Sequence, residues 1–412
     1  MKGNCIVAQS GGPTAAINAS LCGVYLEMSG SSDVGKVFGG INGIQGILED
    51  RLLDLGPILS DKRNVDILRQ TPSSSLGSCR FKLGKPEDKP ELYKKAFEIF
   101  KKHDIKYFFY IGGNDSMDTI HSLSMYAKAE GHDIRFMGVP KTVDNDLVKI
   151  DHAPGYGSCA KFVSTIVMET AQDNSVYDME SVFIIEAMGR DAGWIAISAA
   201  LARERDGAPV ADLIYTPETT FNVDKYLSDI SDLRQKKRFM LVVVSEGLRD
   251  SNDVYLADTG EVDAFNHKRL GGAGSVLAEI TRGNLDIKVR SVELSLLQRS
   301  ASHITSATDI AESEKLGKLA ARGALDGMTH KMPILTRVSD EPYEVEYSYA
   351  DVSEIANAVK KVPDDFINSQ RNHATEKAIK YMRPIIAGET TCIMENNLPV
   401  FINLASIYRK SV

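Results

Sequence analysis

Blocks of apolar residues alternate with polar, glycine-rich loops along this chain, and the clearest example covers residues 106–147. Its first block, Tyr107–Ile111, is an apolar and aromatic run bounded by glycines, which is typical of a buried strand. Met117–Glu130 has the pattern of a helix, and Ile134–Val139 is a second short apolar run that ends at a proline. These elements predict a strand–loop–helix–strand unit, the building block of a parallel sheet with helices on its faces.

Similar patterns extend over most of the chain and favour the α/β fold class. The further predicted strands are Asn4–Ala8, Val34–Phe38, Ser181–Ala187, Arg238–Val244, Lys331–Leu335 and Glu344–Tyr349. The further predicted helices are Ala15–Met28, Glu91–His103, Ala160–Asp173 and Thr308–Gly327.

Two loops, GGNDS and PKTVDND, follow the two strands of the first unit. Ligands bind at the carboxyl ends of parallel strands, and paired glycines before a helix suit an anion. The loops also carry Lys141 and four carboxylates (Asp115, Asp118, Asp144 and Asp146). Carboxylates beside a phosphate are expected where a divalent metal bridges them or one acts as a base. Each loop alone is adequately explained as a turn, but together they favour a phosphoryl-transfer site.

Other candidate residues are weaker when taken singly. Gly11 and Gly12 lie where a strand meets a helix, but such turns also occur for packing, and neither a Walker A loop nor a GxGxxG fingerprint is present. Glu246 follows a very apolar strand, where a carboxylate suits hydrogen bonds from sugar hydroxyls. Four further candidates are isolated arginines, which would ordinarily be solvated surface residues. They are Arg80, Arg190, Arg290 and Arg299.

Composition narrows the class of protein. With 412 residues the chain can bury a large core and form two domains, and 43% hydrophobic with 25% charged residues is ordinary for a soluble protein. A net charge of −8 without a long basic block argues against a nucleic-acid partner. No apolar run reaches membrane-spanning length, and the first residues lack the apolar core of a signal peptide. Five cysteines without a CxxC pair fit reduced thiols in the cytoplasm.

Several motifs together resemble the phosphofructokinase superfamily, specifically its pyrophosphate-dependent branch. They are SGGPTAAIN from Ser10, IGGNDS, GVPKTVDNDL, MGR at residues 188–190 and LLQR ending at Arg299. The resemblance implies two Rossmann-like three-layer domains with mostly parallel sheets and an active site in the cleft between them. Residues 1–150 would form the domain for pyrophosphate and Mg²⁺, and residues 151–412 the fructose 6-phosphate domain, with a C-terminal tail able to pack back on the first.

The resemblance also implies roles for individual residues. Asp144 would be the general base, with Thr142 orienting the acceptor hydroxyl and Arg80 and Arg190 stabilising the transferring phosphoryl group. The donor would contact Gly11, Gly12, Asp115 and Lys141, and Asn114 and Asp146 would hold the metal. The sugar phosphate would contact Thr142, Val143, Asp144, Met188, Gly189, Arg190, Glu246, Arg290 and Arg299.

Departures from the family pattern refine this expectation. ATP-using relatives have glycines where Asp115 and Lys141 stand; the aspartate would repel the α-phosphate of ATP, and the lysine would attract pyrophosphate. Asn114 replaces the usual metal-binding aspartate, and Ser181 stands where many relatives present an arginine to a neighbouring subunit's substrate. The usual histidine before Gln298 is missing, and the first helix lacks the basic residues that bind effectors in allosteric relatives.

The resulting hypothesis is a reversible, Mg²⁺-dependent and non-allosteric transfer of phosphoryl from pyrophosphate to fructose 6-phosphate. The partners would be small molecules and further copies of the chain in a dimer or tetramer, in the cytoplasm, without nucleic acid or membrane.

An ATP-dependent enzyme and a non-catalytic regulatory subunit of the same family are the alternatives. Asp115 with Lys141 counts against the first and Asp144 against the second, whereas a lipid or NAD kinase would not need MGR, Glu246 or the late arginines. The acceptor range stays open, including sedoheptulose 7-phosphate.

Overall fold

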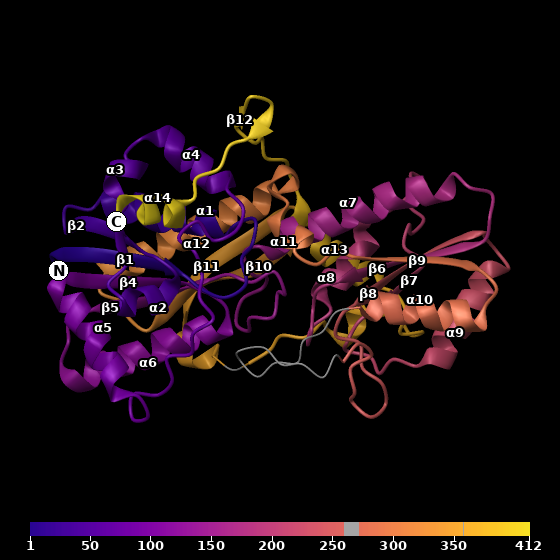
Figure 1. Cartoon of the computed structure of the whole chain (residues 1–412), viewed down its shortest axis with the longest axis horizontal. Helices are drawn as coiled ribbons and strands as arrows, with labels where there is room; N and C mark the ends of the chain where they lie inside the picture. Colours follow the sequence, from indigo (N-terminus) through magenta and orange to yellow (C-terminus); the bar gives the residue numbers. More distant parts are fainter. Residues whose placement is uncertain (259–271, 357) are drawn as a thin grey trace.

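The computed structural model describes residues 1–258, 272–356 and 358–412, and these residues contain two large sheets, each covered by helices on both faces (Figure 1). The first sheet has the strand order β11-β10-β5-β4-β1-β2-β3, and the second has the order β7-β8-β6-β9. Within these two sheets all strand pairs are parallel except β2–β3 and β10–β11 in the first. The predicted fold class is therefore confirmed.

The bounds of the strands agree closely with the predicted apolar runs where those were assigned. The first sheet consists of β1 (Gly3–Gln9), β2 (Val34–Gly40), β3 (Leu52–Asp54), β4 (Ile105–Gly112), β5 (Arg135–Pro140), β10 (Lys331–Asp340) and β11 (Tyr343–Asp351). The second consists of β6 (Ser181–Ala187), β7 (Leu213–Tyr215), β8 (Phe239–Ser245) and β9 (Lys288–Glu293), and a separate hairpin of β12 (Met394–Glu395) and β13 (Leu398–Pro399) lies near the C-terminus.

Side-chain alternation along β4 explains why helices cover both faces of the first sheet. Phe108 and Tyr110 pack in one apolar cluster with α2 (Gly43–Leu48), α5 (Pro90–Lys102) and α6 (Asn114–Glu130). Tyr107 and Phe109 point the other way, because successive strand residues face opposite sides. They pack with the helices of the opposite layer, which are α1 (Ile17–Ser29), α4 (Lys62–Gln70), α12 (Ala307–Leu325) and α14 (Leu404–Ser411).

The second sheet repeats this arrangement. Helices α7 (Tyr156–Ser175), α8 (Trp194–Ile197) and α13 (Glu376–Met382) share one apolar cluster with Ile185 and Val243. Helices α9 (Val223–Arg234) and α10 (Ala273–Asn284) share another with Ile184 and Val242. Shorter helical turns connect these elements: α3 (Gly56–Leu59), α11 (Leu297–Ser300), η1 (Ser198–Leu201), η2 (Ser302–Ile304), η3 (Val352–Glu354), η4 (Asp364–Phe366) and η5 (Arg383–Ile386).

The chain crosses between the two sheets more than once. It leaves the first sheet after β5 and returns to it with α12, β10 and β11, which were expected in the second half at residues 151–412. Residues 362–385 then contribute to the core of the second sheet, and α14 packs against the first. The two sheets are therefore not built from residues 1–150 and 151–412 respectively, because β10 and β11 pair with the first sheet although they lie far from its other strands in the sequence.

Two general expectations can be compared with the structure. All five cysteines are described and are free thiols. None of the helices among the described residues combines the length and apolar character that a membrane crossing requires.

Candidate active site

The loop that follows β5 carries most of the candidate chemistry. It contains Lys141, Thr142, Asp144 and Asp146, and the backbone N–H of Asp144 donates to Oγ1 of Thr142 at 3.1 Å. Helix α6 begins beside it, and Nδ2 of Asn114 lies 3.4 Å from Oδ2 of Asp146. The GGNDS and TVDND loops therefore lie in contact at one edge of the sheet.

Asp144 lies in a group of buried and charged side chains that shift its pKa. Burial, followed by the negative charges of Asp146 and Glu246, raises its pKa to about 7, against the opposing charges of Lys141 and Arg299. Glu246 and Arg299 come from the second half of the chain, so the site brings together residues from both sheets. A carboxylate that titrates near neutral pH can accept a proton and release it again.

Lys141 is a buried cation at the centre of this group. Its side chain is 2% exposed, and burial lowers its pKa to about 8 although Asp144 and Asp146 act in the opposite direction. Its amine donates to the carbonyl oxygen of Gly12 at 2.5 Å. A Cβ on Gly11 would lie 3.5 Å from this amine, so the loop of Gly11 and Gly12 after β1 lies against the lysine.

Arginines approach the same carboxylates. Burial and the nearby charge of Arg80 lower the pKa of Arg299, whereas Asp144 and Glu246 raise it. Arg299 also lies against the loop of Gly11 and Gly12, because a Cβ on Gly12 would lie 3.2 Å from Nη1 of Arg299. Arg80 is solvent-exposed, as is Asp115 in the first turn of α6. Negative groups of a substrate placed here would meet several cations.

The MGR segment follows β6 and is held tightly by its neighbours. The N–H of Gly189 donates to Oε1 of Glu246 at 3.2 Å, and Oγ of Ser245 donates to the Gly189 carbonyl. The N–H of Met188 donates to Oε1 of Gln298 at 3.2 Å. Gly189 has φ +126, and a Cβ there would meet the Ala192 carbonyl oxygen at 2.6 Å, so this position requires glycine.

Arg190 and Arg290 occupy different environments. Nε of Arg190 is buried and has no hydrogen-bond partner among the described residues. Burial raises the pKa of Glu246, whereas the hydrogen bond from Gly189 and the charge of Arg190 act in the opposite direction. Arg290 is exposed on β9 and lines a small surface pocket with Ser181, at the amino end of β6. The structure therefore does not bring Arg290 together with Arg299 in one chain.

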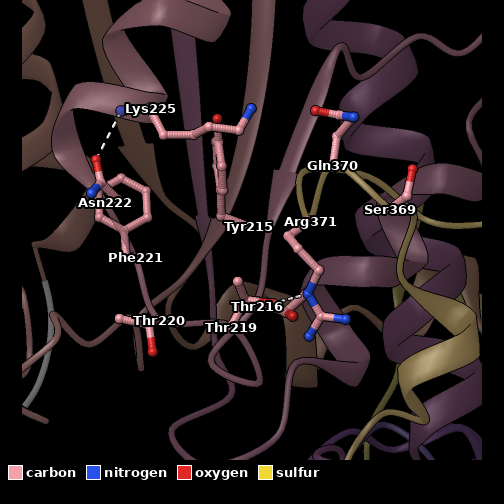
Figure 2. Close-up of a pocket in the computed structure, with 10 residues that line it drawn as sticks. All are labelled: Tyr215, Thr216, Thr219, Thr220, Phe221, Asn222, Lys225, Ser369, Gln370 and Arg371. Carbon is pink, nitrogen blue, oxygen red and sulfur yellow. Dashed lines mark hydrogen bonds between the residues drawn. The ribbon is translucent and has the colours of Figure 1, made fainter.

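A cavity of about 410 Å³ lies beyond β7, apart from the residues named so far (Figure 2). Its two cations are already paired: Lys225 contacts Asp229 at 2.6 Å, and Arg371 contacts Asp364 at 2.5 Å. The side chain of Asn222 is used to cap α9. Since these polar groups have partners, we assign the chemistry to the loop after β5 and not to this cavity.

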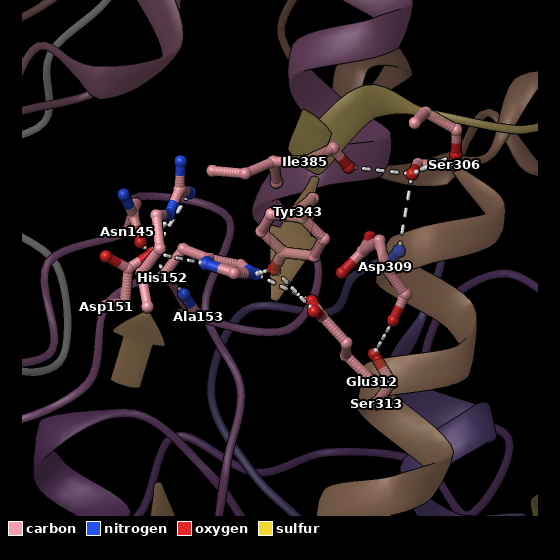
Figure 3. A network of polar contacts seen from close by, with 12 residues as sticks. Asn145, Asp151, His152, Ala153, Ser306, Asp309, Glu312, Ser313, Tyr343 and Ile385 are labelled. Atoms are coloured by element: carbon pink, nitrogen blue, oxygen red, sulfur yellow. Dashed lines mark hydrogen bonds and ion pairs between the residues drawn. The ribbon is translucent and has the colours of Figure 1, made fainter. Parts of the chain in front are cut away.

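Behind that loop, a buried polar network connects it to α12 and β11 (Figure 3). His152 is 1% exposed and contacts Asp151 at 2.7 Å and Glu312 at 2.6 Å. Tyr343 donates to the same Glu312 at 2.6 Å. Burial by itself lowers the pKa of His152, but the hydrogen bonds with Asp151 and Glu312 outweigh it and raise the pKa above its usual value.

This network predicts a pH-dependent stability. A histidine whose folded pKa is raised contributes stability that is fully present below about pH 6.5 and is lost as pH rises through its folded pKa. The difference in the free energy of unfolding between wild type and His152→Gln should therefore be larger at pH 6 than at pH 9. Urea denaturation at both pH values measures it, and a difference that is constant or grows with pH would contradict the prediction.

Sequence reasoning missed several residues that support the site. Gln298 and Ser245 hold the MGR segment, and Lys360 contacts the loop after β5. Gln298 was noticed only for lacking a histidine before it. Lys360 lies in no motif, and no pattern in the sequence singles it out.

The donor atoms near Asp146 fit a magnesium ion. Oδ1 of Asn114 is buried without a hydrogen-bond partner among the described residues. Those residues also contain no cluster of three His, Cys, Asp or Glu side chains suited to a metal. Mg²⁺ is commonly held by one or two carboxylates together with water and substrate phosphates, so Asp146 with an amide oxygen suffices.

Comparisons with known proteins identify the family to which the chain belongs. A family model described as Phosphofructokinase matches residues 4–323, and the chain belongs to this family. It is 40% identical to the pyrophosphate–fructose 6-phosphate 1-phosphotransferase of Halomonas elongata, covering 98% of this chain and 96% of that protein. The protein of the same name from Methylococcus capsulatus is 38% identical, with the same two coverages. The crystal structure of a pyrophosphate-dependent phosphofructokinase from Nitrosospira multiformis is similar with a TM-score of 0.87 and 34% identity, covering 97% of this chain and 96% of that one.

Proposed function

We propose that this protein reversibly transfers a phosphoryl group from pyrophosphate to the C1 hydroxyl of fructose 6-phosphate, giving fructose 1,6-bisphosphate and phosphate. The observation that carries the proposal is Asp144, whose pKa is raised to about 7 in a group with Lys141 and Arg299. The relatives named above, which cover nearly the whole chain, support the choice of donor and acceptor.

In the forward direction Asp144 takes the proton of the C1 hydroxyl while that oxygen forms a bond to phosphorus. The bridging P–O bond of pyrophosphate breaks, and its electron pair leaves with phosphate. Thr142, which accepts the Asp144 N–H, orients the hydroxyl. Arg80, Arg190 and Lys141 offset the negative charge on the transferring group.

Sugar recognition falls to the second half of the chain. Glu246 accepts from sugar hydroxyls, Met188, Gly189 and Val143 line the sugar, and Arg299 binds its phosphate. We propose a homo-oligomer, dimer or tetramer, in the cytoplasm. In that assembly Arg290 would contact only the substrate of a neighbouring copy, because its side chain is exposed near the amino end of β9, beside Ser181. Light scattering of the purified protein tests the oligomer.

Following the reaction by phosphorus NMR tests the proposed chemistry. Fructose 6-phosphate and pyrophosphate should give rise to the signals of fructose 1,6-bisphosphate and inorganic phosphate in equal amounts. Release of two phosphates per pyrophosphate without a new ester signal would contradict phosphoryl transfer to the sugar.

Magnesium would be held by Asp146 and Asn114, where it would neutralise charge on the donor's oxygens. Asp146→Asn should raise the Mg²⁺ concentration for half-maximal activity by roughly tenfold or more, since a charged ligand is lost. Asn114→Asp should lower it, because a charge is added at the buried amide oxygen. Magnesium titrations of both variants check this pair, and an unchanged Mg²⁺ requirement in Asp146→Asn would contradict the assignment.

Effector insensitivity is expected from the composition of α1. Helix α1 contains no lysine or arginine along Ile17–Ser29. Saturation with fructose 6-phosphate should therefore be hyperbolic, and ADP or phosphoenolpyruvate should leave it unchanged. Initial rates over a range of fructose 6-phosphate check this, and a sigmoidal curve shifted by phosphoenolpyruvate would show an effector site elsewhere.

A further inference from the structure

The segment that follows η3 lies against the loop carrying the catalytic residues. The backbone N–H of Lys360 donates to the carbonyl oxygen of Asp146 at 2.7 Å. The amine of the same lysine donates to Oδ1 of Asn145 at 3.2 Å and to the carbonyl oxygens of Ile150 at 3.2 Å and Asp151 at 2.7 Å. An ammonium has three N–H donors, so all of them are used on this one loop.

The loop needs such support because of its backbone conformation. Asn145, between Asp144 and Asp146, has φ +53 and is fully buried. A non-glycine residue in the left-handed region costs free energy and persists where its surroundings hold it. Oδ1 of Asn145 also accepts from the N–H of Ala153 at 2.9 Å, so this oxygen joins Lys360 to the middle and the end of the loop.

The same short segment is fixed on its other side to the acceptor half of the site. The indole Nε1 of Trp194 donates to the Lys360 carbonyl oxygen at 2.9 Å, and the Lys360 amine lies 5.3 Å from the Trp194 ring centroid. Oε1 of Glu218 accepts from the N–H of Val362 at 3.0 Å and from that of Gly193 at 2.9 Å. Gly193 and Trp194 follow the MGR segment by a few residues.

From these contacts we propose that Lys360 is a positioning residue: it holds the Asp144–Asp146 loop in its reactive conformation and fixes it to the loop that follows Met188–Arg190. The inference deepens the proposed function, and it rests on that function for its kinetic test.

Steady-state kinetics of Lys360→Met test the role. Misplacing a reacting group by about 1 Å costs roughly 100-fold in rate, so kcat should fall by about 10–100-fold. The KM values for fructose 6-phosphate and pyrophosphate should stay within about threefold, because Lys360 contacts the loop and not the groups assigned to bind substrate. Lys361→Met is the matched control, since Lys361 is adjacent and exposed; its kcat should stay within about twofold of wild type.

Chemical rescue separates positioning from a general structural effect. In Lys360→Ala, added propylammonium replaces the missing three carbons and the charge, and it should raise kcat at least about fivefold, whereas 1-propanol should not. If Lys360→Met fails to fold, Lys360→Gln carries the same measurement. The proposal is overturned if either variant keeps more than half of the wild-type kcat, if Lys361→Met loses as much, or if propylammonium has no effect.

Fluorescence supplies a readout that does not require activity. Trp194 is the sole tryptophan of the chain, and it contacts both the carbonyl and the amine of Lys360. Its emission should shift in Lys360→Met and not in Lys361→Met. An unchanged emission in Lys360→Met would overturn the proposed link, whereas a wild-type protein inactive with pyrophosphate would overturn the proposed function and leave this measurement intact.

Discussion

Asp144→Asn is expected to lower kcat by roughly 10²–10⁴-fold, because the amide cannot accept the proton of the C1 hydroxyl. The KM for fructose 6-phosphate should change little, since shape and hydrogen-bonding capacity are largely kept. The fold should survive as well. Burial and nearby carboxylates raise the pKa of Asp144 to about 7. At alkaline pH the ionised Asp144 side chain therefore lowers the free energy of unfolding of the wild-type protein. The melting temperature of the variant at pH 8 should therefore equal or exceed that of wild type.

The matched control for this experiment is Asp178→Asn. The Asp178 side chain is 88% exposed and pairs with Arg238, so the same chemical change there should leave kcat within about twofold of wild type. A residual kcat in Asp144→Asn above about a tenth of wild type would rule out Asp144 as the base.

Donor choice should change when Asp115 and Lys141 are replaced. Asp115→Gly should raise kcat/KM with ATP, because an exposed carboxylate that would repel the α-phosphate is removed. Lys141→Gly should mainly lower kcat/KM with pyrophosphate, because a buried cation beside Gly12 is lost. The double variant should shift the ratio of the two kcat/KM values more than either single change. These residues share one site, so their effects need not add.

A volume control is needed for Lys141, whose side chain is 2% exposed. Lys141→Met keeps most of the packing and removes the charge, so it should lose pyrophosphate activity as Lys141→Gly does. The assignment of Asp115 fails if Asp115→Gly gains nothing with ATP, and that of Lys141 fails if Lys141→Met uses pyrophosphate as well as wild type.

The parts of the fold that were predictable are those with strong local patterns. β4 alternates Tyr107, Phe108, Phe109 and Tyr110 between two apolar clusters, and such a run cannot be stable outside a covered sheet. β9 was not recognised as a strand because it is an edge strand whose charged residues are exposed. The place of β10 and β11 in the first sheet depends on pairing with β5, which no local pattern encodes.

The candidate site likewise contains residues that the sequence predicted and residues that it could not predict. The loops around Asn114 and Asp144 were recognisable because glycines and carboxylates follow apolar strands, and the structure brings them together with Glu246 and Arg299. Arg290 could not be placed from spacing alone, since the strand between it and Arg299 separates them. Lys360 was invisible because its partner Asn145 lies 215 residues earlier in the chain.

The central claim is the use of pyrophosphate as phosphoryl donor. Its most direct test is the initial rate of fructose 1,6-bisphosphate formation by the wild-type protein with Mg²⁺ and saturating fructose 6-phosphate, with pyrophosphate or ATP as donor. The account predicts a kcat/KM for pyrophosphate at least about 100-fold above that for ATP, equivalent to roughly 2.7 kcal/mol of discrimination. A preference for ATP, or no product from either donor, would contradict it.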